Sequence, residues 1–309
     1  MISIPKLKKG DAVTIVSTAR KISKDEIQPA IDLLKSWGLI PVLGKTIGAE
    51  ENQFAGSDTF RESDFQSMLD NPEIKAIWCA RGGYGTVRIL DRLDFSEYKK
   101  SPKWIVGYSD VTVLHSHLHN LGYETLHAPM PVDVAKQSDE AVSCLKKTLF
   151  GEELTINYDS RDTRSRPGIG VGQLVGGNLS ILYSLCGSAS AIDTKGKILF
   201  IEDLDEYLYH IDRMMQNLKR NGYFEELAGL IVGGMDDMRD NTKAFGFKTD
   251  NPFGKTAKEI IDEVVSDYDF PVCFDFPAGH TNDNRALILG REVELIVSDE
   301  YFSVEFKKK

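Results

Sequence analysis

Residues 12–118 alternate between short apolar runs, which are typical of buried strands, and segments with the spacing of amphipathic helices. The strand candidates are Ala12–Val16, Leu39–Leu43, Ala76–Cys79 and Trp104–Val106. The helix candidates are Ile27–Leu34 after a Ser23–Glu26 capping-box pattern, Arg61–Leu69, Val87–Leu93 and a segment from Val111 to Leu118. Because strands that alternate with helices usually pair in parallel, with helices on both faces, this part predicts an α/β fold with a mainly parallel sheet.

The second half of the chain has a mixed pattern that ends in strands. Its helix candidates are Leu179–Leu185, Tyr207–Asn221 and Lys255–Tyr268, and its strand candidates are Ile198–Ile201, Leu230–Val232, Ala286–Leu289, Glu292–Val297 and Phe302–Phe306. Before it lie one helix candidate, Glu140–Leu149, and a polar run, Asp159–Arg166. We therefore expect an N-terminal domain at 1–135, a connection at 136–168 and a mixed α+β domain with an antiparallel end at 169–309.

Composition and charge exclude several classes of partner. The net charge is −10 and the lysines and arginines are scattered, whereas a protein that binds nucleic acid needs a basic face. No segment approaches the roughly 18 uninterrupted apolar residues that a membrane span needs. The opening residues lack an apolar signal region, so the expected location is the cytoplasm. The cysteines, Cys79, Cys144, Cys186 and Cys273, form no CxxC pair, which favours buried thiols over zinc ligands or disulfides.

The segment Trp104–Leu118 combines strand, turn and helix patterns around a serine. Trp104–Val106 resembles the end of a buried strand, a Gly-Tyr pair turns the chain, and apolar residues recur with helical spacing from Val111 onward. A serine at a sharp strand-to-helix turn exposes its hydroxyl at the sheet edge, where the N–H groups of the new helix can stabilise an oxyanion. Ser109 is therefore a candidate nucleophile; the alternative is that Ser109 and Asp110 only cap the helix.

A serine nucleophile needs a base, and the nearest histidines are poor candidates for that role. His115, His117 and His119 follow Ser109 on the same predicted helix, and a base one to three turns down that helix points the wrong way. His115 and His119 share a face and could bind a metal, but no recognisable ligand pattern accompanies them. Packing or solvated histidines are the favoured interpretation.

Two residues at predicted strand ends are better placed. His280 stands at the tip of a Pro-Ala-Gly loop, and loop tips at strand ends concentrate catalytic groups in α/β proteins. Glu202 directly follows the strand Lys197–Ile201, where its carboxylate could accept the Nδ1–H of a histidine. Taken alone, His280 would more simply be a surface loop histidine.

The segment Arg81–Gly85, R-G-G-Y-G, is called the glycine loop below. It follows a predicted strand, but it lacks the Lys-Ser/Thr of a P-loop and the G-x-G-x-x-G spacing, so nucleotide binding is disfavoured. A glycine loop beside a serine turn can instead lend backbone N–H groups to an oxyanion. A plain tight turn is the alternative.

Taken together, these segments resemble the LD-carboxypeptidase family of serine peptidases over nearly the whole chain. The motifs are R-G-G-Y-G at Arg81–Gly85, G-Y-S-D at Gly107–Asp110, H-A-P at His127–Pro129, G-G-N-L at Gly176–Leu179, I-E-D around Glu202 with Y-x-x-D-R at Tyr209–Arg213, and G-H at Gly279–His280. The resemblance implies a flavodoxin-like N-terminal domain and a smaller, β-rich α+β C-terminal domain. It also implies a catalytic triad of Ser109, Glu202 and His280, an oxyanion hole from the N–H groups of Asp110 and Gly83, and no metal or other cofactor.

The resemblance further implies hydrolysis of the bond between an L-diamino acid and a terminal D-alanine in cytoplasmic murein tetrapeptides, by a homodimer. Such a substrate has a free carboxylate, for which Arg81 and Arg213 are candidate contacts, although ion pairing is the favoured role for Arg213. Tyr84 could cover the substrate or simply pack. A related branch of the family confers immunity to microcin C by cleaving an aminoacyl-nucleotide, and this activity remains an alternative. A non-catalytic, amidotransferase-like binding module is a third possibility.

Overall fold

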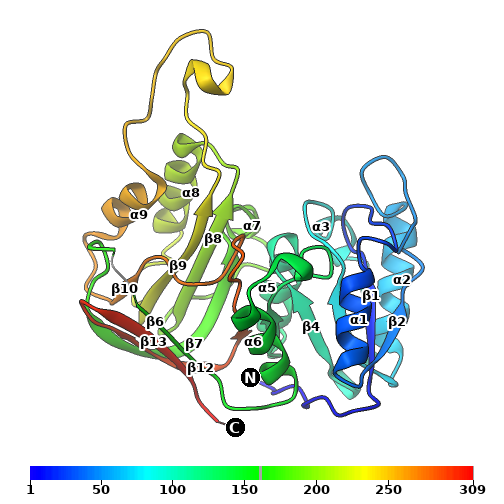
Figure 1. Cartoon of the computed structure of the whole chain (residues 1–309). Coiled ribbons are helices and arrows are strands. Elements are labelled where there is room, and N and C mark those ends of the chain that lie inside the picture. Colours follow the sequence, from blue (N-terminus) through cyan, green and yellow to red (C-terminus); the bar gives the residue numbers. More distant parts are fainter. Residues whose placement is uncertain (160–161, 309) are drawn as a thin grey trace. The chain divides into compact units, whose positions relative to one another are not determined.

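The computed structural model describes residues 1–159 and 162–308 (Figure 1). The chain divides into two compact units. Unit 1 contains Met1–Leu154, Asn282–Arg291 and Lys308, and unit 2 contains Thr155–Thr281 and Glu292–Lys307. Among the described residues, no helix is both long enough and apolar enough to cross a lipid bilayer.

Unit 1 is built on a parallel sheet with one antiparallel edge strand. Within the described residues its six strands lie in the order β11-β5-β4-β3-β1-β2. The five neighbouring strands from β5 to β2 pair in parallel, and β11 pairs antiparallel with β5. The strands are β1 (Ala12–Val16), β2 (Ile40–Leu43), β3 (Ile74–Cys79), β4 (Trp104–Gly107), β5 (Thr125–His127) and β11 (Leu287–Leu289). The order 2-1-3-4-5 is that of flavodoxin-like folds, so the predicted α/β class is confirmed.

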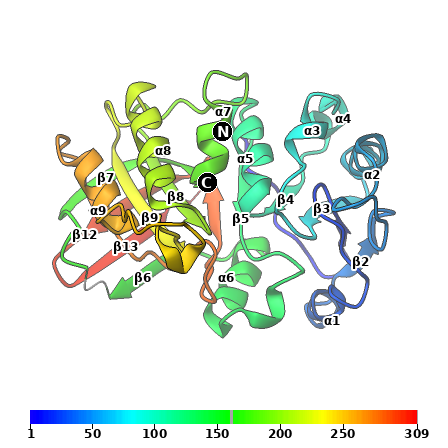
Figure 2. The same ribbon diagram turned by 90° about the horizontal axis from the view of Figure 1, so that it is seen from above.

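Helices cover both faces of this sheet, with α1 and α6 on one side and α3 and α5 on the other (Figure 2). Ser57 and Ser138 cap α2 and α6 by accepting hydrogen bonds from backbone N–H groups. Ser23 and Glu26 do bond to each other, but they stabilise a turn that precedes α1 and do not cap the helix. The helices are α1 (Gln28–Ser36), α2 (Asp58–Asp70), α3 (Val87–Leu90), α4 (Ser96–Lys100), α5 (Thr112–Asn120) and α6 (Asp139–Leu149), with short 3-10 turns η1 (Ser109–Val111) and η2 (Val134–Lys136).

Unit 2 contains a mixed sheet. Within the described residues its seven strands lie in the order β10-β9-β8-β7-β12-β13-β6, parallel from β10 to β7 and antiparallel from β7 to β6. This arrangement confirms the predicted α+β character with an antiparallel end. The strands are β6 (Thr155–Asp159), β7 (Gly168–Asn178), β8 (Ile198–Leu204), β9 (Gly229–Asp236), β10 (Val272–Cys273), β12 (Glu292–Val297) and β13 (Tyr301–Phe306).

The helices of unit 2 bury their apolar faces against the parallel part of this sheet. The helices are α7 (Leu179–Leu185), α8 (Leu208–Arg220) and α9 (Ala257–Val265), with a 3-10 turn η3 (Lys243–Phe245). On α8 the buried residues Ile211, Met214, Met215 and Leu218 recur at helical spacing. Each such side chain contributes about 1.5–3 kcal/mol by leaving water, so this face fixes α8 against β8 and β9.

The units do not follow the boundaries that the sequence suggested. The segment expected to connect two domains, 136–168, contains α6 in unit 1 and β6 in unit 2, while Ser160 and Arg161 lie outside the described residues. The segment Asn282–Arg291 returns to unit 1, because β11 completes the edge of that sheet. The four cysteines are free thiols, and all but the partly exposed Cys186 are buried.

Candidate active site

Ser109 stands on a strained turn between β4 and α5. Its φ is +61°, in the left-handed region that residues other than glycine seldom adopt. Gly107 makes the turn possible, because a Cβ on it would lie 2.9 Å from Val111 Cγ2 and 3.3 Å from Cys79 Cβ. The local geometry is thus the sharp strand-to-helix turn that presents a serine hydroxyl at the edge of a sheet.

The glycine loop approaches this serine through Gly82. A Cβ on Gly82 would lie 3.0 Å from Ser109 Oγ and 3.3 Å from the amide nitrogen of Asp110. Gly83, which sequence reasoning favoured, is exposed and has φ +104°, and a Cβ there would lie 2.5 Å from Arg20 Nε. Gly82 therefore makes room for Ser109, a role that no sequence signal marked and that is separate from the oxyanion N–H expected of Gly83.

Asp110 ties the serine turn to the glycine loop. Its carboxylate is buried, and Oδ2 accepts a hydrogen bond from the Thr86 backbone N–H at 2.9 Å. Burial raises the pKa of this carboxyl group above its ordinary value, and the contacts with Thr86 and Gly85 oppose that rise. The backbone N–H of Asp110 remains at the helix start beside Ser109, where an oxyanion donor is needed.

The histidines on α5 pack within unit 1. Burial lowers the pKa of His115 to about 4, so the ring is neutral, and its Nε2–H donates to the Gly107 carbonyl at 2.8 Å. The ring of His117 lies 5.3 Å from that of Phe95. Across residues 1–159 and 162–308, no group of three His, Cys, Asp or Glu side chains has an arrangement that could hold a metal ion. His115 therefore supports the serine turn by holding the carbonyl two residues before Ser109.

Unit 2 contains a carboxylate–histidine pair. Glu202 lies in β8 with no exposed surface, and its Oε2 is 2.6 Å from His280 Nδ1 and 3.2 Å from the His280 backbone nitrogen. A Cβ on Gly279 would lie 2.9 Å from Glu202 Oε2, so a glycine is needed for the loop to come this close. Because a carboxylate at Nδ1 fixes the Nδ1–H tautomer, the other ring nitrogen, Nε2, is the one that can accept a proton.

Buried polar groups surround this pair. Asp203 accepts hydrogen bonds from the Asn178 side chain at 2.9 Å and from the Ser180 backbone N–H at 2.8 Å, so it ties β8 to the start of α7. Burial raises the pKa of Asp203 to about 7, and the neighbouring negative charge of Glu202 adds to this rise as the second cause. Asp203 is buried because β8 extends to Leu204.

The proposed substrate contacts on the glycine loop lie in unit 1. Arg81 Nη1 donates to the Lys21 carbonyl at 3.3 Å and lies 3.7 Å from Glu26 Oε1, so its guanidinium is partly engaged. Tyr84 is 44% exposed, and its ring lies 6.2 Å from that of Phe54. Both side chains are accessible on the loop that approaches Ser109.

Arg213 lies on the exposed face of α8 in unit 2. Its guanidinium carbon is 5.2 Å from the centre of the Tyr209 ring, a cation–π contact, and the expected ion pair is not found among residues 1–159 and 162–308. The candidate residues therefore fall into two groups. Ser109 and its loop neighbours belong to unit 1, whereas Arg213, Glu202 and His280 belong to unit 2.

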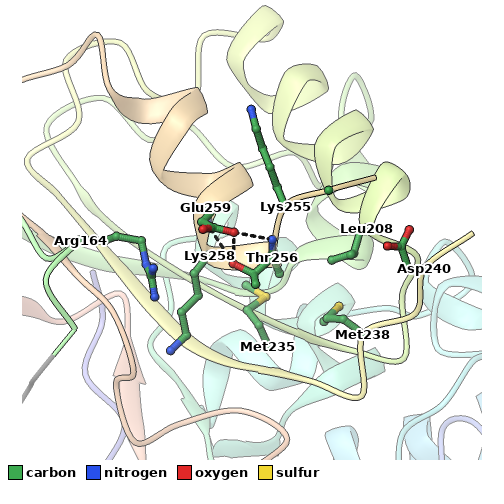
Figure 3. Close-up of a pocket in the computed structure, with 11 residues that line it drawn as sticks. Arg164, Leu208, Met235, Met238, Asp240, Lys255, Thr256, Lys258 and Glu259 are labelled. Atoms are coloured by element: carbon green, nitrogen blue, oxygen red, sulfur yellow. Dashed lines mark hydrogen bonds between the residues drawn. The ribbon is translucent and has the colours of Figure 1, made fainter. Parts of the chain in front are cut away.

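Unit 2 also contains a cavity of about 610 Å³ at the starts of α8 and α9 (Figure 3). It is lined by Arg164, Leu208, Met235, Met238, Asp240, Gly254, Lys255, Thr256, Ala257, Lys258 and Glu259. Its polar groups are mostly engaged: Arg164 and Lys258 both pair with Asp162, and Thr256 and Glu259 form a capping box. Its lining side chains include no nucleophile with a histidine base, so we do not assign the reaction centre to it.

Models of one protein family match most of the chain. The model of the LD-carboxypeptidase N-terminal domain matches residues 13–128, and that of the LD-carboxypeptidase C-terminal domain matches residues 171–295. The chain belongs to the LD-carboxypeptidase family. Among related proteins, a probable murein peptide carboxypeptidase of Bacillus subtilis is 35% identical over 97% of this chain and 93% of its own length. A murein tetrapeptide carboxypeptidase of Pseudomonas aeruginosa is 27% identical over 92% of each.

Solved structures agree with the LD-carboxypeptidase assignment. The crystal structure of a muramoyltetrapeptide carboxypeptidase from Oxalobacter formigenes matches with a TM-score of 0.84 at 26% identity, over 96% of this chain and 99% of that one. The microcin C7 self-immunity protein MccF, in complex with aspartyl sulfamoyl adenosine, matches with a TM-score of 0.85 at 22% identity, over 98% of each chain. At this lower identity, the similarity to MccF shows that the two chains share a fold.

Proposed function

We propose that this LD-carboxypeptidase family member is a serine carboxypeptidase that hydrolyses the bond between an L-diamino acid and the terminal D-alanine of murein tetrapeptides, in peptidoglycan recycling. The observation that carries the proposal is the 2.6 Å hydrogen bond between buried Glu202 and His280, because it prepares a histidine to act as a base. The strained serine turn and the names of the two bacterial relatives support the same conclusion.

In the proposed mechanism, Ser109, His280 and Glu202 act together in acyl transfer. The Ser109 hydroxyl attacks the scissile carbonyl and His280 takes its proton, while Glu202 stabilises the imidazolium that forms. The N–H groups of Asp110 and Gly83 donate to the oxyanion, each worth about 3 kcal/mol in comparable sites. His280 then protonates the leaving amine of D-alanine. Water, deprotonated by the same histidine, releases the acyl group and restores the serine.

The first test is the Ser109→Ala variant. Without the hydroxyl no acyl-enzyme can form, so D-alanine release from a murein tetrapeptide should fall by more than about a thousandfold while the unfolding midpoint stays unchanged. Ser36→Ala, an exposed serine on α1, serves as the matched control and should retain full activity. A Ser109→Ala variant that keeps most of the activity, or a parent activity that a chelator abolishes, would contradict the serine mechanism.

A second candidate substrate is an aminoacyl-nucleotide. The observation that favours it is an aromatic surface in unit 2, where Tyr207 stacks on Tyr209 with ring centres 5.6 Å apart and Tyr209 is 37% exposed. Exposed aromatic rings of this kind can stack on a nucleobase. Trp78 does not contribute, because it is buried and its Nε1–H donates to the Pro129 carbonyl. Measuring the cleavage of both substrates by the same preparation, with Ser109→Ala as the blank, decides between them.

The proposed setting is the cytoplasm, and the proposed assembly is a homodimer. Both are what the resemblance to the family implies. Light scattering coupled to size exclusion measures the mass directly, and a mass near the 34.5 kDa of one chain would contradict the dimer.

A further inference from the structure

Arg61 is a fully buried cation for which the reaction described above has no use. It lies on α2, its side chain has no exposed surface, and it is among the largest fully buried side chains of the molecule. Burying a guanidinium is costly unless every donor finds a partner, so its surroundings show what it holds in place.

The partners of Arg61 are mainly backbone carbonyls of loops at the carboxyl edge of the sheet. Nη1 donates to the Thr18 carbonyl at 2.5 Å and to the Gly85 carbonyl at 3.0 Å. Nε donates to the Gly56 carbonyl at 3.3 Å, and Nη2 pairs with Asp58 at 2.5 Å. One nitrogen therefore joins the loop after β1 to the last residue of the glycine loop.

The same two loops are joined again on the side of the serine. The hydroxyl groups of Thr18 and Thr86 lie 2.8 Å apart, and the Thr86 N–H donates to the Asp110 carboxylate at 2.9 Å. Asp110 follows Ser109 directly. Two hydrogen bonds, connected by the Gly85–Thr86 peptide bond, thus link Arg61 to the nucleophile turn.

Close packing leaves the glycine loop little freedom at this end. A Cβ on Gly85 would lie 2.9 Å from Arg61 Nη1 and 3.1 Å from Phe54 Cε1. The Phe54 ring covers the guanidinium, with Arg61 Cζ 4.7 Å from its centre. At the other end of the loop, Gly82 packs against Ser109 Oγ.

We propose that Arg61 is a positioning residue. It fixes the position of the glycine loop relative to Ser109, and with it the position of the Gly83 backbone N–H that donates to the oxyanion. The inference rests on the proposed function. A planar guanidinium with donors in a fixed fork can hold the Gly56, Thr18 and Gly85 carbonyls at once, whereas a lysine ammonium is a compact point charge on a flexible stem. A shift of about 1 Å in a catalytic group can lower the rate about a hundredfold, so loosening this loop should lower the rate of reaction at Ser109.

The experiment measures how fast a small fluorophosphonate modifies Ser109, with the site of modification located by mass spectrometry. An Oγ–P bond forms as the Ser109 proton passes to His280, the P–F bond breaks with its electron pair leaving on fluoride, and the phosphoryl oxygen develops charge where the carbonyl oxygen of a substrate would. Arg61→Lys should react about 10–100-fold more slowly at the same unfolding midpoint, and with tetrapeptide its kcat should fall while KM stays within about threefold. The pH at half-maximal rate should not move, because no base is changed.

Arg88→Lys is the matched control. Arg88 pairs with the same Asp58 and lies against the same Phe54 ring, but its side chain holds none of the three loop carbonyls, so this variant should react within about threefold of the parent rate. Phe54→Leu, which loosens the cover on Arg61, should slow the reaction several-fold, and it decides the matter if Arg61→Lys does not fold.

Three outcomes are decisive. A folded Arg61→Lys that reacts as fast as Arg88→Lys overturns the inference, and so does an unchanged Phe54→Leu when Arg61→Lys does not fold. In either case the proposed function stands. A parent protein whose Ser109 is not modified at all contradicts the proposed function, and the inference falls with it.

Discussion

At the residue scale, the Glu202–His280 pair gives the sharpest chemical constraint. Glu202 is a buried carboxylate whose Oε2 receives both the Nδ1 contact and the backbone N–H of His280. Two bonds to one oxygen fix the position as well as the tautomer of the ring. Such a carboxylate acts in two ways, because it orients the imidazole and stabilises its positive form.

Glu202→Gln should therefore lower kcat for D-alanine release by about a thousandfold or more, with KM nearly unchanged. The amide can donate to Nδ1 and so favours the wrong tautomer, and it carries no charge to stabilise the imidazolium. Glu206→Gln is the matched control, since Glu206 also holds a histidine, His210, at 2.5 Å on the same segment of chain. A Glu202→Gln variant within tenfold of the parent would remove Glu202 from the mechanism.

At the element scale, the site depends on how closely loops approach one another. Gly82 is not among the glycines with positive φ, so alanine there need not enter the left-handed region, yet the new methyl group would lie 3.0 Å from Ser109 Oγ. Gly82→Ala should therefore reduce kcat about a hundredfold while the unfolding midpoint stays within a few degrees of the parent. Thermal unfolding and steady-state kinetics on one preparation test this, and equal losses of stability and activity would contradict it.

The sequence could predict those elements whose side-chain periodicity carries the signal. The apolar runs of β1, β3 and β4 and the helical spacing of α7 and α8 are read directly, because packing against one face imposes them. Strand β7 was missed because it is rich in glycine. Its Gly170 and Gly176 replace side chains where the carbonyls of Ala228 and Phe200 come within 2.2 and 1.9 Å of a Cβ position.

The candidate site was predictable to a smaller extent. The Ser109 turn follows from a local pattern, but the pairing of Glu202 with His280, residues 78 positions apart, came only from family resemblance. Arg61 was invisible, because in the sequence it looks like an ordinary polar residue at the start of a helix. Which carbonyls a buried guanidinium meets is decided by loops that come together only in the folded chain.

At the scale of the whole molecule, two buried groups make stability depend on pH in opposite directions. Burial lowers the pKa of His115 in unit 1 to about 4. Between about pH 6.5 and 4, His115 is therefore protonated in the unfolded chain but neutral in the folded chain. Acidification from 6.5 to 4 therefore costs unit 1 about 3 kcal/mol. Asp203 in unit 2 has its pKa raised to about 7. The stabilisation of unit 2 by the protonated Asp203 is therefore fully present below about pH 4 and is lost as the pH rises to 7.

The two effects can be separated, because all three tryptophans, Trp37, Trp78 and Trp104, lie in unit 1 and report on that unit alone. In urea unfolding followed by tryptophan fluorescence, the parent should lose stability steadily from pH 6.5 to 4. His115→Gln, which has no group that titrates in this range, should lose less. His210→Gln, a partly exposed histidine of unit 2, should follow the parent curve. Parallel curves for the parent and His115→Gln would show that the folded chain protonates His115 as readily as the unfolded chain does, and burial could not then be what keeps the ring neutral beside the nucleophile turn.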